Sequence, residues 1–276
     1  MAATTDKAVV DYRHITENQR KSWSLGDYQP IALQTMDMNE ELIRAINPHP
    51  TQRILDVACG SGNGALVAAR RDCEVFGIDF VPDWIERARK RAEAEGVVAD
   101  FKVGDAQDIP YPDNSFDVVV SVLGVMFVPD QEKAASELLR VCKPGGKIGL
   151  WSHTPDGVVG KMFGVLAPYS PPPPNGLKSP MRWGTEDGIH ELLGGGTRSI
   201  ENTPKTMYIY ARSVDYQVEM FKKYYGPTSN LFNTLPPDKH EEVHNTMIDL
   251  LQSYNRATNG TMILEIDYIQ TIAVRV

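Results

Sequence analysis

Short apolar runs alternate with helical stretches between Arg53 and His153, and this alternation constrains the fold more than any other feature of the chain. It is typical of a parallel β-sheet that carries helices on both faces. Each run is rich in β-branched residues, as buried parallel strands usually are. The sequence Lys143-Pro144-Gly145-Gly146 predicts a tight turn before the last run. We therefore predict five strands, at residues 53–57, 74–79, 100–103, 116–121 and 147–152.

The segments on either side of this region follow other patterns. The first fifty residues are polar and helical in character, with a break at 26–30, and they predict a helical lid. Beyond the fifth run, Pro171 to Pro174 exclude a helix, so residues 168–180 should form an extended surface loop. A ligand for a proline-binding domain is the alternative interpretation of that loop. The remaining pattern predicts a helical cap and two closing strands, at residues 214–257, 205–212 and 261–276 respectively.

Length and composition suit one large domain, because 276 residues with 42% hydrophobic side chains can bury a sizeable core. We divide it into a lid at 1–50, a central core at 51–154, and a remainder of the same domain at 155–276. That remainder holds the proline-rich loop, the cap and the closing strands.

Charge, hydropathy and cysteine content narrow the class of protein. A net charge of −8 argues against nucleic acid as a partner. No apolar run approaches the roughly 20 residues that span a bilayer, and Met1 to Lys7 lack the apolar core of a secretion signal. We therefore expect no membrane partner and a cytoplasmic location. The three cysteines form no CxxC pair, which predicts reduced, buried thiols rather than disulfides or a zinc site.

A glycine-rich loop connects the first predicted strand to the helix that follows it. The loop runs from Asp56 to Gly64, and its three glycines allow sharp turns and close approach of a ligand to the backbone. An acidic residue, Asp79, ends the second strand, where a carboxylate can accept both hydroxyls of a ribose. Together these features predict a cofactor that contains adenosine.

The spacing within the loop bears on which adenosine cofactor is bound. Dinucleotide sites have the spacing GxGxxG, whereas this loop has GxGxG with Asp56 just upstream. A carboxylate there suits the ammonium group in the tail of S-adenosylmethionine, which NAD lacks. We therefore favour S-adenosylmethionine, and an NAD-type oxidoreductase is the alternative.

From Arg53 to His153 the chain resembles the class I S-adenosylmethionine-dependent methyltransferases, and most of all the quinone C-methyltransferases and related small-molecule enzymes. Five ordered matches carry the resemblance: Leu55 to Gly62, the acidic strand end Asp79, Gly104 to Pro110, Phe116 to Val119, and Leu138 to Gly146. It implies a Rossmann-like three-layer α/β sandwich with a seven-stranded, mostly parallel sheet whose last strand is antiparallel. It also implies S-adenosyl-L-methionine as cofactor and S-adenosyl-L-homocysteine as product.

The resemblance also implies roles for individual residues of the cofactor site. Asp56, Ala58 and Gly60 would hold the methionine part, with Cys59 and Gly62 in the same loop. Asp79 would hold the ribose, and Asp105 with the Ala106 backbone would hold the adenine edge. Phe80 would pack beside the adenine, Tyr28 would close over the cofactor, and Ser121 and Val122 would line the floor near the methyl group.

Methyl transfer from a sulfonium is an in-line displacement, so the protein mainly has to hold donor and nucleophile together. A phenol, enol or thiol acceptor would gain from a base. His153, at the end of the fifth strand, is the candidate; capping of the next turn is the alternative role. We expect acceptor specificity in residues 158–198 and 214–257. Their aromatic side chains suggest a flat acceptor, although aromatic residues at helical spacing more often form core.

These observations lead to a functional expectation with two alternatives. We expect a methyltransferase acting on a small aromatic or heteroaromatic molecule through an oxygen, sulfur, nitrogen or carbon nucleophile. An NAD-type oxidoreductase and a non-catalytic protein that binds S-adenosylmethionine are the alternatives. We expect no bound metal, no nucleic acid and no membrane partner, and either a monomer or a homodimer.

Overall fold

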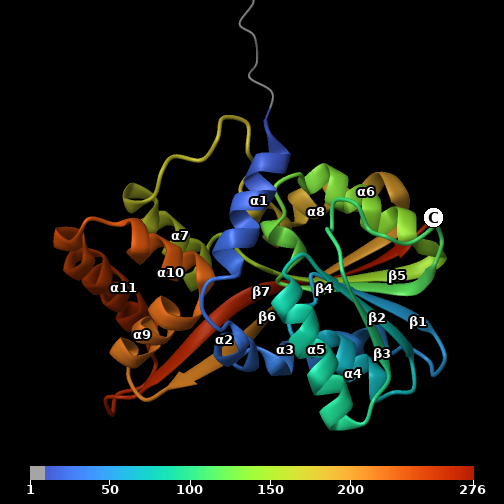
Figure 1. Ribbon diagram of the computed structural model, residues 1–276, viewed down its shortest axis with the longest axis horizontal. Coiled ribbons are helices and arrows are strands. Elements are labelled where there is room, and N and C mark those ends of the chain that lie inside the picture. Colours follow the sequence, from blue (N-terminus) through green and yellow to red (C-terminus); the bar gives the residue numbers. More distant parts are fainter. Residues whose placement is uncertain (1–9) are drawn as a thin grey trace, which may run out of the picture.

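The computed structural model describes residues 10–276, so the first residues of the predicted lid and the start of the chain considered for a secretion signal lie outside it. Seven strands form one sheet in the order β3-β2-β1-β4-β5-β7-β6, and Figure 1 shows helices on both of its faces. The first five strands are parallel, and β7 (Met262–Arg275) runs antiparallel between β5 and β6. The predicted three-layer fold is therefore confirmed.

The predicted strands match the structure closely at the centre of the sheet. β1 (Arg53–Val57) and β2 (Glu74–Asp79) have the predicted bounds, and β3 (Ala99–Val103) and β4 (Phe116–Val122) are each one residue longer. β5 (Cys142–His153) instead begins before the predicted turn. Its pairing with β4 shifts between Phe116 and Val118, so residues 143–146 form an irregularity within the strand rather than a turn ahead of it.

The closing strands extend well beyond the central sheet. β6 (Thr197–Ala211) begins earlier than predicted and pairs with β7 from Thr197 to Ala211. The cap lies between these two strands in the sequence. It consists of α9 (Val214–Tyr224), α10 (Gly226–Thr234) and α11 (His240–Tyr254), and it packs on the far ends of the hairpin through Met207, Ile209 and Leu264.

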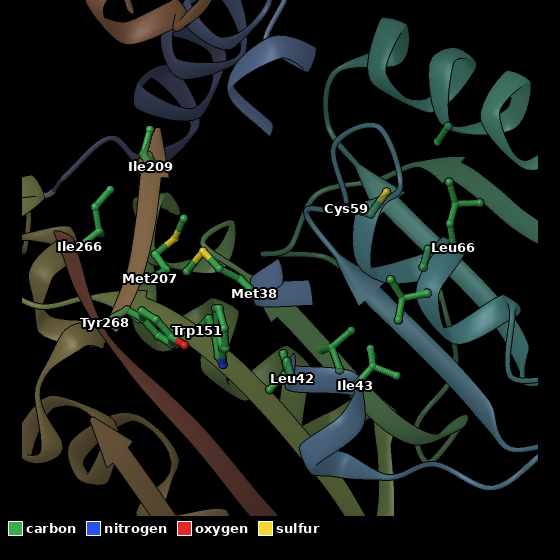
Figure 2. Close-up of a cluster of buried hydrophobic side chains, with 14 of the residues drawn as sticks. Met38, Leu42, Ile43, Cys59, Leu66, Trp151, Met207, Ile209, Ile266 and Tyr268 are labelled. Carbon is green, nitrogen blue, oxygen red and sulfur yellow. The ribbon is translucent and has the colours of Figure 1, made fainter. Parts of the chain in front are cut away.

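Helices cover the two faces of the sheet with separate hydrophobic cores. On one face, Met38, Leu42 and Ile43 of α3 (Met36–Ile46) lie between Trp151 and Tyr268 on one side and Cys59 and Leu66 on the other (Figure 2). The other face carries α6 (Gln131–Val141) and α8 (Glu186–Leu193), with Trp183 fully buried against them. Part of the segment 158–198 therefore packs away from the face that α3 covers.

The chain reverses its direction of travel across the sheet between β1 and β4. From β1 it continues through α4 (Asn63–Ala69) to β2 and through α5 (Pro82–Glu95) to β3, whereas β4 lies on the other side of β1. Ligands of such sheets bind at this switch point, beyond the carboxyl ends of the strands. No helix within residues 10–276 is long and apolar enough to span a bilayer.

The predicted lid at 1–50 divides into two parts, because α3 packs on the sheet whereas α1 (Tyr12–Trp23) and α2 (Gln29–Leu33) meet the cap along a seam. We keep the name lid for α1 and α2. A Cβ atom on Gly26 would lie 2.7 Å from the carbonyl oxygen of Lys223, and one on Gly226 would lie 2.2 Å from that of Ser22. Side chains have no room at either position. The amides of Gln34 and Gln217 also hydrogen-bond to each other in both directions, at 3.0 and 3.1 Å. Lid and cap are thereby joined by backbone contact.

Candidate active site

The loop after β1 turns by means of residues with positive φ. Ala58 has φ of 56°, Gly60 of 54° and Gly62 of 88°. A Cβ atom on Gly60 would meet no atom within 4 Å, so the backbone there borders open space. One on Gly62 would lie 3.1 Å from the ring of Phe101. Gly60 therefore allows approach of a ligand, whereas Gly62 allows the helix after the loop to pack closely.

The Asp56 carboxyl group lies at the end of β1 and is almost fully buried. Its Oδ2 accepts a hydrogen bond from the backbone N–H of Ala65 at 2.8 Å. Burial, together with the nearby charge of Asp79, raises the pKa of Asp56 to about 7, although the hydrogen bond from Ala65 opposes the shift. No cation among the described residues lowers it. A buried carboxylate in this setting gains most from a positively charged ligand.

The Asp79 carboxylate fixes the turn at the end of β2. Its Oδ2 accepts a hydrogen bond from the N–H of Gly60 and its Oδ1 accepts one from that of Val81, both at 2.9 Å. Burial raises the pKa of Asp79 to about 6, although these backbone hydrogen bonds oppose the shift. Each oxygen still has a free lone pair, so Asp79 can accept further hydrogen bonds from ligand hydroxyls.

A cavity of about 60 Å³ lies at the switch point. Six of the predicted site residues line it: Tyr28, Asp56, Ala58, Cys59, Gly60 and Val122. Sequence reasoning missed the other six: Ala32, Thr35, Asn39, Ser61, Asn63 and Leu123. Three of these adjoin predicted residues in the chain and could have been included on that ground. The other three come from α2 and the start of α3, where no sequence signal marked them.

A second cavity, of about 370 Å³, lies between α1 and the ends of β2 and β3. Phe80 and Asp105, which we expect at the adenine end of the cofactor, line it, whereas Ala106 is buried and does not. Gln107 closes one side. It donates hydrogen bonds from Nε2 to Asp105 and, at 2.9 Å, to Thr16 of α1, so this side chain attaches the lid to the site.

Four predicted cofactor residues lie outside the lining of both cavities: Gly62, Asp79, Ala106 and Ser121. Ser121 is held there by the main chain. Its hydroxyl is fully buried, donates to the carbonyl of Val57 at 2.7 Å and accepts from the N–H of Val125 at 3.0 Å. It lines neither cavity. Both hydrogen-bonding directions serve the main chain, so Ser121 supports the floor, while Val122 and Leu123 form its surface.

His153 lies at the carboxyl end of β5, nearly buried, and lines neither cavity. Side chains alternate along a strand, so it shares a face with Trp151, which pairs with Val122 of the cavity floor. Its Nδ1 has no hydrogen-bond partner among the described residues. Burial lowers the pKa of His153 to about 4, so the imidazole is neutral at neutral pH.

Aromatic side chains from five separate segments meet in one cluster, which reaches the smaller cavity through Tyr28. Trp23 of the lid lies edge-on to Tyr28, to Phe127 and to Tyr225 of the cap, with ring centroids 5.7, 5.4 and 5.3 Å away respectively. Phe163 of α7 (Val158–Leu166) stacks on Phe127 at 6.3 Å. We call these five residues the aromatic cluster. It brings part of the predicted cap to the cofactor side of the molecule.

The residues present fit S-adenosylmethionine better than a dinucleotide. The buried Asp56 carboxyl group, with no cation of the described residues beside it, suits a ligand that carries an ammonium group and would repel a pyrophosphate. The open space at Gly60 and the larger cavity beyond Asp79 leave room for the tail and the adenosine part respectively.

Comparisons with known proteins agree with this geometry. A family model described as a methyltransferase domain matches residues 55–150. An uncharacterised protein of Mycobacterium tuberculosis is 36% identical over 227 residues, which cover 82% of this chain and 83% of that one. A demethylmenaquinone methyltransferase of Thermus thermophilus is 40% identical over 118 residues, or 41% of this chain and 54% of that one.

Solved structures share the fold at low identity. The YcgJ protein of Bacillus subtilis superposes with a TM-score of 0.62 at 19% identity, covering 87% of this chain and 98% of the other. A phosphoethanolamine N-methyltransferase of Haemonchus contortus, solved with S-adenosylhomocysteine, has a TM-score of 0.54 at 19% identity, covering 87% and 52%.

The chain belongs to the class I S-adenosylmethionine-dependent methyltransferases. It is thus a transferase with S-adenosylmethionine as its cofactor, and the alternative of an NAD-type oxidoreductase is set aside.

Proposed function

We propose that this enzyme methylates a small aromatic or heteroaromatic molecule. The observation that carries the proposal is the buried Asp56 carboxyl group at a cavity that Tyr28 of the aromatic cluster also lines. The buried Asp79 carboxyl group accepts a hydrogen bond from the N–H of Gly60 in the same cavity lining. The carboxyl groups suit a cationic methyl donor, and the ring faces suit a flat acceptor next to it. The name of the Thermus relative, a demethylmenaquinone methyltransferase, supports an acceptor of this general kind.

Bound S-adenosylmethionine supplies an electrophilic methyl group. In our proposal, Asp56, Ala58, Cys59 and Gly60 hold its methionine part, and Asp79 accepts the ribose hydroxyls. Phe80, Asp105 and the Ala106 backbone hold the adenine, with Gln107 added to them because it bonds Asp105 directly. Tyr28 closes the cavity, Val122 forms its floor, and Ser121 and Gly62 keep the surrounding backbone in place.

We further propose that His153 is the general base for acceptors that must lose a proton. Its neutral ring and unpartnered Nδ1 leave it able to accept a proton at that nitrogen. The pKa of His153 in the protein without ligand is about 4, so its protonation should not limit turnover until the pH falls well below neutrality.

An acceptor screen tests the proposed function. Purified enzyme with S-adenosylmethionine and a panel of phenols, quinols, thiols and amines is analysed for methylated products by mass spectrometry. Methylation of at least one flat aromatic acceptor is expected. A product from none of them, with cofactor binding confirmed by calorimetry, would instead support the non-catalytic alternative.

The same assay tests the base. His153→Gln should lower kcat by about a hundredfold or more with little change in cofactor affinity. The exposed His190 of α8 provides the matched control, because His190→Gln removes the same group far from the cluster. Equal rates for the two variants would exclude a role for His153 in proton transfer.

The cytoplasmic location and a monomeric or homodimeric state are further parts of the proposal. Sedimentation analysis of the purified chain would distinguish a monomer from a dimer.

A further inference from the structure

A half-buried arginine of α5, Arg91, hydrogen-bonds to two residues of the loop after β1. Its Nη1 donates to the carbonyl oxygen of Ser61 at 2.8 Å and to the Oγ of the same residue at 3.1 Å. It also donates to Oδ1 of Asn63 at 2.6 Å. Ser61 and Asn63 are almost fully buried and line the smaller cavity, whereas Arg91 does not line it. Arg91 can therefore act on the cavity through two residues of its wall.

The positive charge of Arg91 is not neutralised by an ion pair within residues 10–276. All three of its acceptor atoms are neutral. Glu95, whose charge acts on Arg91, is itself paired with Arg70 at 2.6 Å. A guanidinium stays ionised in proteins, and a partly buried charge is costly unless an opposite charge lies near it. No residue that lines the smaller cavity is a cation. Arg91 is thus a source of positive charge bonded directly to the cavity wall.

Two hydrogen-bond donors of this wall are available to a ligand. The hydroxyl of Ser61 accepts a bond from Arg91 and donates to no acceptor within the described part of the chain. The amide of Asn63 uses one hydrogen on the carbonyl of Ala32 at 2.9 Å, and its oxygen faces Arg91, so the orientation of the amide is fixed. The second amide hydrogen has no acceptor among the same residues. A cation bonded to both side chains polarises them and strengthens their donation.

The smaller cavity therefore combines groups that suit opposite charges. The buried carboxyl group of Asp56 suits an ammonium group, as described above. The donors of Ser61 and Asn63, polarised by Arg91, suit an anion, and hydrogen bonds to an ionised acceptor are the stronger kind. An α-amino acid carries an ammonium group and a carboxylate on one carbon atom. The tail of S-adenosylmethionine has this structure, so both sets of groups can bind it together.

We propose that Arg91 is a positioning residue for the methyl donor, because it orients Ser61 and Asn63 to donate hydrogen bonds to the carboxylate of the amino-acid tail. This assignment rests on the proposed function, which places that tail at Asp56, and adds the groups that recognise its carboxylate. Arg91 acts through the two side chains and through its charge, without touching the donor. Placement of the tail matters for the reaction, since it fixes the position of the methyl group relative to the acceptor.

Calorimetry with two ligands tests the assignment without turnover. One is S-adenosylmethionine, and the other is its decarboxylated form, which keeps the ammonium and sulfonium groups but lacks the carboxylate. The wild type should bind S-adenosylmethionine more tightly. Arg91→Gln should weaken that binding by about tenfold, the effect of losing one hydrogen bond to a charged group, and leave the affinity for the decarboxylated form unchanged. Ser61→Ala, which removes one of the two donors, should show the same selectivity with a smaller loss.

Lys90→Gln is the matched control, because it removes a positive charge from the adjoining, exposed residue of α5, whose ion pair is with Glu86 of the same helix. It should bind both ligands as the wild type does. The proposal is overturned if Arg91→Gln binds S-adenosylmethionine as tightly as this control, or if it weakens both ligands equally, as a general distortion of the loop would. It is also overturned if the wild type binds both ligands equally. Each of these results can occur while the acceptor screen still yields product, so failure of Arg91 is distinguishable from failure of the proposed function.

Discussion

The two halves of the site are held together in different ways. In the cofactor half, residues 53–153, the main chain sets the geometry: Ala58 and Gly60 adopt positive φ, and Asp56 and Asp79 bond to backbone N–H groups. In the proposed acceptor half, where the lid meets the cap, packing between side chains positions the rings, which meet at 5–6 Å around Trp23 beside the backbone contact at Gly26 and Gly226.

This difference separates the two tasks of the enzyme. Main-chain geometry is insensitive to most side-chain changes, so the cofactor half can bind the same ligand in many different proteins. Packing between lid and cap changes with every ring that is replaced. We therefore expect substitutions in the cofactor half to affect donor affinity, and those in the aromatic cluster to affect the acceptor.

The largest effect is expected from Asp79→Ala. The substitution removes the acceptor for two backbone N–H groups and for the ribose hydroxyls, each bond to a charged group being worth about 1.5–3 kcal/mol. Affinity for S-adenosylhomocysteine, measured by calorimetry, should fall at least about a hundredfold. Asp83→Ala, at the exposed start of α5, should bind normally. Unchanged affinity in Asp79→Ala would show that the Asp79 carboxylate does not bind the cofactor.

A smaller effect on cofactor affinity is expected when the pH is varied. Because the pKa of Asp56 is raised to about 7 in the free protein, its carboxyl must lose a proton to pair with a cation. Cofactor affinity should therefore weaken by up to about tenfold per pH unit below that value. Asp56→Asn should lose this dependence near neutrality, and calorimetry of both proteins over the same pH range would reveal it. Parallel pH profiles would exclude Asp56 as the titrating group.

The raised pKa of Asp56 has the opposite consequence for folding stability. The folded-state pKa of Asp56 lies above its usual value of 3.8, so the ionised form disfavours the folded state. This cost is complete above about pH 7 and is relieved as the pH falls toward about 4. Acid should thus weaken cofactor binding while Asp56 itself makes the free protein more stable.

The smallest effect is expected from placing alanine at a glycine of the cofactor loop. Gly60 and Gly96 both have positive φ, and a Cβ atom at either would meet no atom within 4 Å. Alanine should therefore lower folding stability similarly at both, by about 1–2 kcal/mol. Only Gly60→Ala should also weaken cofactor binding, by about 1 kcal/mol or fivefold, because its methyl group intrudes on the ligand. Equal affinities in the two variants would show that Gly60 has only a conformational role.

The sequence predicted the strands of the central sheet well because the signals for them are local. The bounds of β1 and β2 coincide with the prediction, since buried parallel strands are short apolar runs. β6 was predicted too short because its first half is a polar edge of the sheet, with Pro204 within it, and lacks an apolar run. The positive φ predicted at 143–146 is present at Gly145, but these residues form an irregularity within β5 rather than a turn ahead of it.

The acceptor half could not be predicted in the same way. Tyr28 was expected at the cofactor and Tyr225 in the cap, but nothing in the sequence indicates that they touch. Ser121 illustrates the same limit on a smaller scale, because only the three-dimensional structure shows that its hydroxyl is used by Val57 and Val125. Contacts between distant segments depend on packing that no short window of sequence contains.

The seam at Gly26 and Gly226 has a consequence for inheritance and for engineering. Gly26 leaves room for the backbone of the cap, and Gly226 leaves room for the backbone of the lid. A cap taken from a relative would therefore fit only a lid that leaves the same space. Recombination that exchanges residues 214–254 alone would join mismatched surfaces, even with every sheet residue unchanged. The range of acceptors would then depend on two separate stretches of the chain, the lid and the cap, which have to be exchanged together.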